Sequence, residues 1–366
     1  MFPTQFTSAS FTWERKELNN ILKINSGRDY KQLNSGNIPV YGTGGYMLSV
    51  NDKLSDTDAV GIGRKGTIDK PLYLKAPFWT VDTLFYCTSK ESSDVKFIYL
   101  LFQIINWKRY DESTGVPSLS KNTISSIKTY VPKVKEQDHI SKLFFSLDNT
   151  LQLHEDYLQL LHSFKIFLAQ KMFFDDDVLP LLRFNGFTEK WSQCKLNDHT
   201  IVTMGQSPNS KNYTNNQTDK ILVQGNADLY KNKVLKRVFT TEITKTAVKN
   251  DILISVRAPV GDIARNQYES VVIGRGIASI KGNDFLYYQL EKMKNSGFWN
   301  KYIAGSTFES ITGKDLKNAK IYTTNSDEER KISNIFSSLT KIIQLQEHKI
   351  DSLKKLKQFL LQNMFI

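Results

Sequence analysis

The sequence predicts an α+β protein in which two domains of mixed α/β structure are separated by two long antiparallel coiled-coil helices, as an internal repeat with pseudo-twofold symmetry. Three observations support this fold class: a long internal repeat, a heptad pattern that closes each copy, and short strand-like runs between turn signals. With 366 residues, 40% of them hydrophobic and 12% aromatic, each half is long enough to bury its own core.

The repeat is visible as matched residues in the two halves. Trp13, Leu18 and Gly27 recur at an offset of 178 as Trp191, Leu196 and Gly205. A second set recurs at an offset of 192, and its members in the first copy are Ser118, Ile140, Phe144, Leu147, Leu161, Lys165, Leu168, Met172 and Phe173. A unit of this length is a domain with a helical arm and not a solenoid repeat, so the chain is expected to do one job at two places.

The globular parts are expected at residues 1–134 and 184–326, and the helical arms at 135–174 and 327–366. Strand-like runs occur at 38–42, 58–63 and 251–256, and helix-like segments at 94–110 and 283–302. The join between the halves opens with Asp175, Asp176 and Asp177 and contains Pro180, which together break the first arm.

Both arms carry apolar residues at alternating steps of four and three, from Ile140 to Met172 and from Ile332 to Met364. Sustained alternation at this spacing is typical of a coiled-coil seam. Polar residues interrupt the two seams at matching places: His154 and Lys165, then Gln346 and Lys357. Two interpretations of them stay open, namely that they fix the register or that they snorkel at the edge of the seam.

The direction of the arms follows from connectivity. The second globular part leaves the C-terminal end of the first arm and enters the N-terminal end of the second. Since the termini of a compact domain usually lie close together, the arms are expected to pair antiparallel.

The formal net charge of +12 is concentrated in the globular parts. Residues 1–135 hold 18 Lys and Arg against 12 Asp and Glu, and residues 184–327 hold 20 against 13. Two separate basic domains favour a polyanionic partner, with a generally basic but inert surface as the alternative. Two cysteines without metal-like spacing, no early apolar run and no long uncharged apolar stretch indicate a cytoplasmic protein without a membrane partner.

Several runs resemble the specificity subunit of type I restriction-modification enzymes, and the resemblance covers nearly the whole chain. They are SGRDYKQLNSGNIPVYGTGGYM (26–47), GIGRKGTIDKPLY (61–73), FWTVDTLFYC (78–87), GVPSLSKNTI (115–124), PLLRFNGFTEKW (180–191), MGQSP (204–208) and DILISVRAPVGDIARN (251–266). The first half departs from the pattern, because it lacks the lead that Pro180 to Phe184 supply in the second half.

This resemblance implies different roles for the globular parts and the arms. Each globular part would be a target recognition domain that reads one half of a split, asymmetric sequence in double-stranded DNA. The arms would set the distance between the halves and hold two methyltransferase subunits, with restriction subunits as further partners. No cofactor is expected in this chain, since the methyltransferase subunits would bring S-adenosylmethionine.

A Gly-rich run first suggests a different function. Gly61, Gly63 and Gly66 match the dinucleotide-binding pattern G-x-G-x-x-G. However, residues 67–71 are a poor start for the helix that such a site needs. The run is therefore expected to be a tight loop that exposes Arg64 and Lys65 to phosphates or base edges, or a purely structural turn.

Other candidate DNA-contacting residues are spread over both halves. Arg257 follows a strand at a stiff turn and suits bidentate contact with guanine, while Gln206 suits an adenine edge. Lys236, Arg237 and Arg275 are candidates for phosphate contacts. The set is completed by Arg28, Tyr41 and Tyr213.

Catalytic and metal-binding patterns are missing from the sequence. No Asn-Pro dipeptide is present, although a single-chain adenine methyltransferase would show one within an N-P-P-[FY] motif, and four of the five histidines lie on the arms without ligand spacing. We therefore expect a non-catalytic subunit without a metal site. Two alternatives remain: a fused restriction-methyltransferase fragment with its own catalysis, and a coiled-coil adaptor with incidental basic charge.

Overall fold

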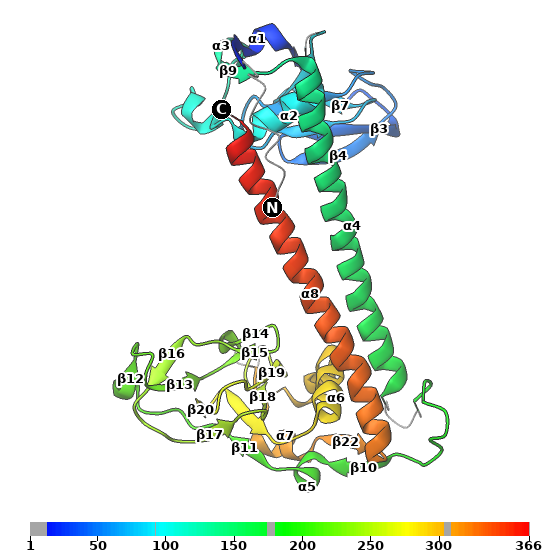
Figure 1. Ribbon diagram of the computed structural model, residues 1–366, viewed down its shortest axis with the longest axis vertical. Helices are drawn as coiled ribbons and strands as arrows, with labels where there is room; N and C mark the ends of the chain where they lie inside the picture. The colour runs from blue at the N-terminus through cyan, green and yellow to red at the C-terminus, as the bar shows by residue number, and fades with distance from the viewer. Residues whose placement is uncertain (1–12, 92, 174–179, 304–308, 366) are drawn as a thin grey trace, which may run out of the picture. The chain divides into compact units, whose positions relative to one another are not determined.

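The computed structural model describes residues 13–91, 93–173, 180–303 and 309–365. The chain divides into two compact units, one made of residues 1–155 and 348–366 and the other of residues 156–347 (Figure 1). Each unit therefore combines one globular part with a segment of each long helix. The acidic run Asp175–Asp177 at the join lies outside the described residues.

The first unit is built on a four-stranded sheet in the order β2-β8-β5-β6, a three-stranded sheet in the order β4-β3-β7, and the pair β1-β9. Its strands are β1 (Glu14–Glu17), β2 (Leu22–Ser26), β3 (Ser35–Gly42), β4 (Gly45–Val50), β5 (Ala59–Gly63), β6 (Leu72–Leu74), β7 (Trp79–Thr80), β8 (Leu84–Ser89) and β9 (Lys128–Val131). Strand β5 is buried along its whole length, which fits its place inside the sheet between β8 and β6.

The helices of the first globular part are α1 (Leu18–Ile21), α2 (Val95–Ile104), the 3₁₀ helix η1 (Trp107–Tyr110) and α3 (Lys121–Ser126). The Asp94 side chain caps α2 by accepting from the N–H groups of Lys96 and Phe97. The helix-like segment predicted at 94–110 is thus split, because the chain is extended at Ile105 before η1 begins.

The second unit has a six-stranded sheet in the order β11-β21-β18-β19-β15-β14, a five-stranded sheet in the order β12-β16-β13-β20-β17, and the pair β10-β22. Its strands are β10 (Ser192–Lys195), β11 (Val202–Met204), β12 (Tyr213–Thr214), β13 (Lys220–Val223), β14 (Leu229–Tyr230), β15 (Lys233–Val234), β16 (Val238–Thr240), β17 (Thr246–Val248), β18 (Ile252–Ser255), β19 (Ile263–Arg265), β20 (Ser270–Ile273), β21 (Ile277–Ile280) and β22 (Lys320–Thr323). Its central strand β18 is also entirely buried.

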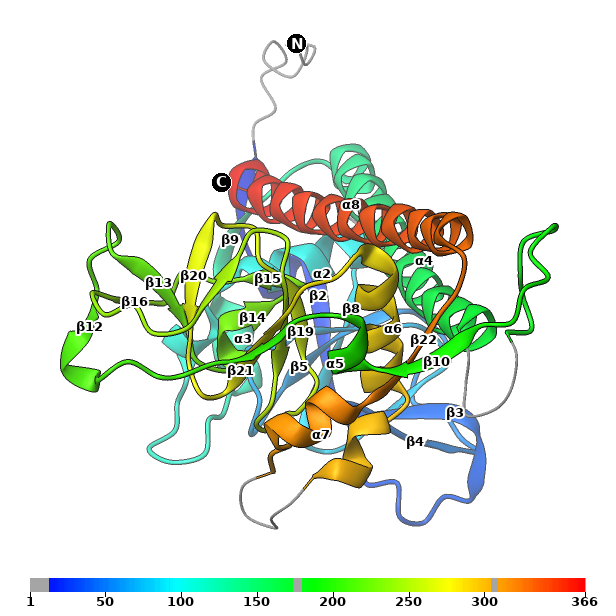
Figure 2. The ribbon, with the colours of Figure 1, turned by 90° about the horizontal axis from the view of Figure 1, so that it is seen from below.

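The helices of the second globular part are α5 (Leu196–His199), η2 (Ser210–Asn212), η3 (Asn226–Asp228), α6 (Asp284–Asn295), η4 (Phe298–Tyr302) and α7 (Gly313–Asn318). Helix α6 lies between the six-stranded sheet and the long helices, and its Phe285, Leu286 and Leu290 belong to the core that also contains Ile254 (Figure 2). The segment predicted at 283–302 is again split, here where Gly297 adopts a positive φ of 71°.

The two units repeat one set of elements, which confirms the internal repeat. Helices α1 and α5 follow strands β1 and β10, and these strands pair antiparallel with β9 and β22 in matching registers. The short helices α3 and α7 directly precede β9 and β22, at an offset of 192.

The long helices are α4 (Val134–Met172) and α8 (Ser326–Met364), each of 39 residues. No helix in the described part of the chain is apolar enough over a sufficient length to span a membrane. In the first unit, Asp148 and Glu155 of α4 pair with Lys357 and Lys354 of α8, at 2.5 and 2.6 Å. The order of the partners is reversed along the two helices, so the segments run antiparallel, as predicted.

The end of each long helix is buried in the core of the other repeat. Phe365, directly after α8, stacks on Phe97 of the first repeat with the ring centroids 5.6 Å apart. Phe173, directly after α4, packs against Phe285 of the second repeat at 5.2 Å and against Phe336 of α8 at 5.4 Å. Each globular core therefore includes a residue contributed by the other half of the sequence.

The polar seam residues have different roles in the two units. Lys357 pairs across the helices with Asp148, as expected for a residue that fixes the register. Lys165 instead pairs with Glu291 of α6 at 2.7 Å and lies 5.3 Å from the centre of the Tyr288 ring. Lys165 thus fixes the globular part against the helix, a role that neither sequence interpretation anticipated.

The lead segment of the second repeat binds a buried carboxylate that belongs to α8. Arg183 donates two hydrogen bonds of 2.8 Å to Glu328, whose side chain is 0% exposed, and Trp191 Nε1 and Thr324 Oγ1 donate to the same carboxylate at 3.1 and 2.6 Å. Burial alone raises the pKa of Glu328, but these bonds outweigh it and hold the pKa below its ordinary value. In the first repeat, Trp13 Nε1 donates to the equivalent Glu136 at 3.2 Å.

We predict that Arg183→Met destabilises the second unit by about 2–3 kcal/mol, because it leaves a buried carboxylate without its cation. Arg330→Met is the matched control, since Arg330 pairs with Asp327 on the surface, where both side chains are more than 60% exposed, and should change stability by less than about 0.5 kcal/mol. Urea unfolding measures both. Because the folded-state pKa of Glu328 is depressed, the stability lost in Arg183→Met should be largest above pH 4.5 and should shrink as the pH falls below it. Equal stabilities of the two variants would contradict the assignment of Arg183 as the partner of the buried carboxylate.

Candidate nucleic-acid interface

In the first unit, Arg28 stands on a loop whose backbone is fixed by the segment that runs from Thr80 at the end of β7 to Leu84 at the start of β8. The N–H of Gly27 donates to Leu84 O at 3.3 Å, and the N–H of Arg28 donates to Thr80 O at 2.8 Å. A Cβ atom on Gly27 would lie 2.0 Å from the carbonyl oxygen of Val81, so this close approach requires glycine. Arg28 is thus an exposed side chain on a firmly held backbone.

Arg64 and Lys65 follow directly after β5 and are both exposed. The N–H of Arg64 donates to Thr83 O at 2.8 Å, and its carbonyl oxygen accepts from Leu119 N–H at 2.9 Å. Lys65 forms an isolated antiparallel bridge with Ser118. Because Thr83 belongs to the same segment that holds Arg28, the fold brings the three predicted cations to one edge of the unit.

The Gly-rich run is a tight loop, as expected. Residues 64–71 contain no helix, so the helix N-terminus on which a dinucleotide pyrophosphate would sit is missing here. A Cβ atom on Gly63 would lie 2.0 Å from Thr67 O, and Gly66 has a φ of +96°. The glycines therefore serve the turn that carries Arg64 and Lys65.

Tyr41 lies beside the same segment, since its carbonyl oxygen accepts from Val81 N–H at 3.0 Å. Its half-buried ring packs edge-to-face on Tyr46, with the centroids 6.4 Å apart. Tyr46 and Met47, 63% and 49% exposed, stand at the start of β4 and were not predicted from the sequence. The sequence signal that could have identified them is the Gly44-Gly45 turn, which is followed directly by these two large side chains.

The second unit repeats these bonds with different side chains. The N–H of Gly205 donates to Ile277 O and that of Gln206 to Ile273 O, both at 2.9 Å. Arg257 bridges Ser310 just as Lys65 bridges Ser118. Gln206 thus occupies the place of Arg28, and Arg257 the place of Lys65. All four side chains are exposed.

Arg275 joins this edge of the second unit. Its N–H donates to Ser207 Oγ at 3.1 Å, and the next residue, Gly276, accepts at its carbonyl oxygen from Val256 N–H at 2.9 Å. The structure therefore brings the exposed Gln206, Arg257 and Arg275 together by their backbones.

The remaining candidates lie between Gln206 and Arg257 in the sequence and are engaged by their own chain. The half-buried Tyr213 donates from its hydroxyl to Pro208 O and Gln224 Oε1, both at 3.4 Å. Lys236 lies 4.9 Å from the centre of the Tyr268 ring. Arg237 donates to Ala227 O at 2.8 Å, which gives it a structural role in addition to any contact with a ligand.

These edges present cations, amides and hydroxyls. The described residues include no group of three or more His, Cys, Asp or Glu that could hold a metal ion. Near Tyr213, the bonds that Asn212 Nδ2 and Asn209 N–H donate to Glu242, both 2.7 Å, lower the pKa of its carboxyl group. That carboxylate therefore braces the loop around Asn209 and Asn212.

The family model described as type I restriction modification DNA specificity domain matches the chain twice, over residues 11–162 and 188–355. A Methanocaldococcus jannaschii protein named as the MjaX type I restriction enzyme specificity subunit is 27% identical over 283 residues, which are 71% of this chain and 65% of that relative. The MjaIX type I restriction enzyme specificity subunit of the same organism is 28% identical over 126 residues, 32% of this chain and 28% of the relative. The matched region thus spans less than two thirds of either relative.

Solved structures share the fold across the whole chain. The S subunit of a type I restriction-modification system from M. genitalium aligns with a TM-score of 0.70 at 15% identity, covering 100% of this chain and 99% of the other. A chain from a type I restriction-modification system, solved for its complex assembly and conformational transition, aligns with a TM-score of 0.62 at 18% identity, covering 96% and 97%.

We predict that Gly205→Ala lowers the free energy of unfolding of the second unit by about 1–3 kcal/mol, because a Cβ atom there would lie 2.1 Å from Gly274 O. Gly225→Ala is the control in the same unit, since a Cβ atom at Gly225 meets nothing within 4 Å. Thermal unfolding of both variants provides the measurement. If Gly205→Ala were as stable as the control, the loop that carries Gln206 would not be held as described.

Proposed function

Because the chain belongs to the type I restriction modification DNA specificity domain family, with two copies of the domain, we propose that it is the sequence-reading and scaffolding subunit of such a system. The observation that carries the proposal is the duplicated set of backbone bonds described above. It presents Arg28 and Lys65 in one unit and Gln206 and Arg257 at the equivalent places in the other. Two similar frames with different exposed side chains suit a target whose two halves differ in sequence.

The proposed reading follows from the side chains. Arg257 is suited to the O6 and N7 acceptors of guanine and Gln206 to the edge of adenine, in a major groove. Lys65, Arg28 and Arg64 would contact guanine or phosphates in the other half-site, with Tyr41 beside them. Lys236, Arg237, Arg275 and Tyr213 would add contacts around the second half-site. On this proposal, residues 1–134 and 184–326 are the target recognition domains, and residues 135–174 and 327–366 the arms.

The long helices offer a surface for partner subunits. In the second unit, Tyr157, Leu160, Phe164 and Phe167 of α4 step by three, four and three residues and are 47–63% exposed. In the first unit, Leu356 and Phe359 of α8, the equivalents of Phe164 and Phe167, are 45% and 60% exposed. Stripes at heptad spacing that remain exposed after the two helices pair favour further helices as partners. We assign them to two methyltransferase subunits, with restriction subunits as further partners.

In this proposal the chain itself is non-catalytic and cytoplasmic, and it binds no cofactor. The methyltransferase subunits would bind S-adenosylmethionine and carry out methyl transfer. The contribution of this chain is to select the DNA site and to hold the partner at it.

We predict that Arg257→Ala relaxes the methylated motif at one position of one half-site and leaves the other half-site unchanged, because a lost bidentate contact removes about 1–3 kcal/mol of discrimination. Methylome sequencing of cells that express the chain with its methyltransferase measures this. Lys65→Ala, the equivalent change, should affect the opposite half-site instead. A motif unchanged in both variants would count against these residues, and methylation without the partner would favour a chain with its own catalysis.

We further predict that the arms act as a spacer. Removing residues 154–160 and the equivalent 346–352 deletes one heptad from each helix and keeps the seam pattern. It shortens each helix by about 10 Å at about 1.5 Å per residue. The unread gap in the methylated motif should shrink by at most about three base pairs, at about 3.4 Å each, while the half-sites stay readable. An unchanged gap, measured by methylome sequencing, would refute the spacer role.

A further inference from the structure

The hairpin of β3 and β4 in the first unit ends in a tip that stands away from the rest of the chain. The two strands pair antiparallel, with Tyr41 opposite Tyr46, and a turn at residues 43–44 joins them. A Cβ atom added to Gly44 or to Gly45 would meet nothing within 4 Å. The turn and the side chains next to it therefore border open space.

Two large side chains at this tip, Tyr46 and Met47, are oriented by their neighbours without being buried by them. The Tyr46 ring packs edge-to-face on Tyr41, and its hydroxyl lies 3.2 Å from Ser49 Oγ. The thioether of Met47 lies over Gly42, where an added Cβ atom would be 2.7 Å from the Met47 sulfur. Both side chains nevertheless remain about half exposed or more, so the core gains little from them and their contacts serve mainly to hold their direction.

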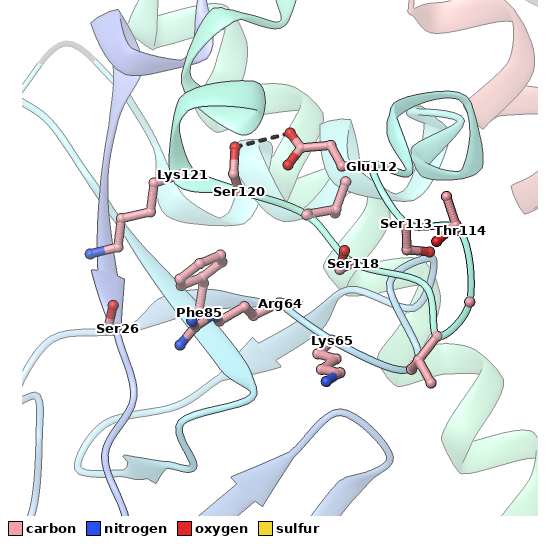
Figure 3. A pocket seen from close by; sticks show the side chains of 13 residues that line it. Ser26, Arg64, Lys65, Phe85, Glu112, Ser113, Thr114, Ser118, Ser120 and Lys121 are labelled. Atoms are coloured by element: carbon pink, nitrogen blue, oxygen red, sulfur yellow. Dashed lines mark hydrogen bonds between the residues drawn. The ribbon is translucent and has the colours of Figure 1, made fainter.

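The tip lies beside the loops that carry the predicted DNA-contacting residues of the first unit. Strand β3 is hydrogen-bonded to the segment after β7, which also fixes the Arg28 loop. The turn itself approaches the loop after β5, because a Cβ atom added to Gly66 would lie 3.7 Å from Thr43 Oγ1. Gly66 directly follows Lys65, which lines an open hollow of about 810 Å³ (Figure 3). The exposed tip is therefore continuous with the basic edge of this unit.

The second unit has a different structure at the equivalent place. The N–H of Gly274 donates to Val223 O at 2.8 Å, in the same way that β3 is bound through Tyr41, so Val223 takes the place of Tyr41. Five residues further on, where the first unit has Tyr46, the second has Asp228, which is 6% exposed and belongs to η3. Its carboxylate accepts from two backbone N–H groups of its own turn, at 2.8 and 3.3 Å. An exposed ring in one unit is thus matched by a buried carboxylate in the other.

We propose that Tyr46 and Met47 form a wedge that enters the base stack of the half-site read by the first unit and opens one base step there, an inference that rests on the proposed function. Apolar side chains that project from a DNA-binding surface can separate adjacent base pairs, and an aromatic face stacks on any base without selecting its identity. Because Asp228 is buried at the equivalent place, the second unit leaves its own half-site stacked. The two units therefore differ in how they deform DNA as well as in which bases they read.

The test uses the full chain assembled with its methyltransferase and a duplex that contains the motif found by methylome sequencing. The fluorescent base 2-aminopurine, which brightens when it loses its stacking neighbours, replaces one base at a time in both half-sites, with the methylated adenines left unchanged. At saturating protein the signal should rise at one step in one half-site only. Tyr46→Ala should abolish this rise and weaken target binding by about 5- to 100-fold, the range for one lost stacked ring. Tyr46→Phe, which keeps the ring, should retain both.

Tyr130→Ala is the matched control, since it removes a 40% exposed tyrosine from β9 of the same unit, and it should behave as the unmodified protein. A duplex with an abasic nucleotide at the opened step gives a second readout. The unmodified protein should bind it more tightly than the intact duplex because less stacking is lost, whereas Tyr46→Ala should show no such preference. Target binding without a local fluorescence rise, a rise retained in Tyr46→Ala, or loss of methyltransferase assembly in that variant would overturn the wedge alone. Failure of the unmodified assembly to bind its target duplex would overturn the proposed function with it.

Discussion

The structure depends on one packing constraint: the aromatic residue that ends each long helix is buried in the core of the other repeat. Phe365 packs on Phe97 and Trp13, and Phe173 packs on Phe285 and Phe336. Aromatic side chains bury large areas and gain further from edge-to-face and offset contacts. Neither globular core is therefore complete with residues of its own half alone, and the two compact units each draw on both ends of the chain.

The residues that hold the fold together are distinct from the exposed side chains that the proposal assigns to DNA. The central strands β5 and β18 are fully buried and end at the loops that carry Lys65 and Arg257. The backbone of these loops is fixed by close approaches such as Gly27 on Val81 O and Gly205 on Gly274 O. The exposed side chains on them make no contribution to the core, so they are free to differ between the units. A rigid frame with variable side chains is what precise recognition needs.

The sequence was sufficient to predict the features that depend on local periodicity and on the repeat. The heptad seams lie within α4 and α8, and the runs at 58–63 and 251–256 became β5 and β18. It was not sufficient where a long-range partner decides the role. Lys165 resembles Lys357 in its seam, yet it pairs with Glu291 because α6 packs there. Likewise, nothing in the sequence distinguishes Arg183 from the other cations, because its partner, the buried Glu328, is brought to it only by the fold.

On the proposed function, the equivalence of the two edges would let one frame serve two different half-sites. Arg28 and Gln206 are held by the same pair of backbone bonds, and Lys65 and Arg257 by the same bridge to a serine. A planar guanidinium and an amide differ in which base edge they match, while a lysine offers only a point charge. The difference between the units therefore lies in side-chain chemistry at fixed positions and not in a different fold. On the proposed function, changing what such a site reads would require no change in the packing that depends on Phe173 and Phe365, so recognition could vary while the architecture is kept.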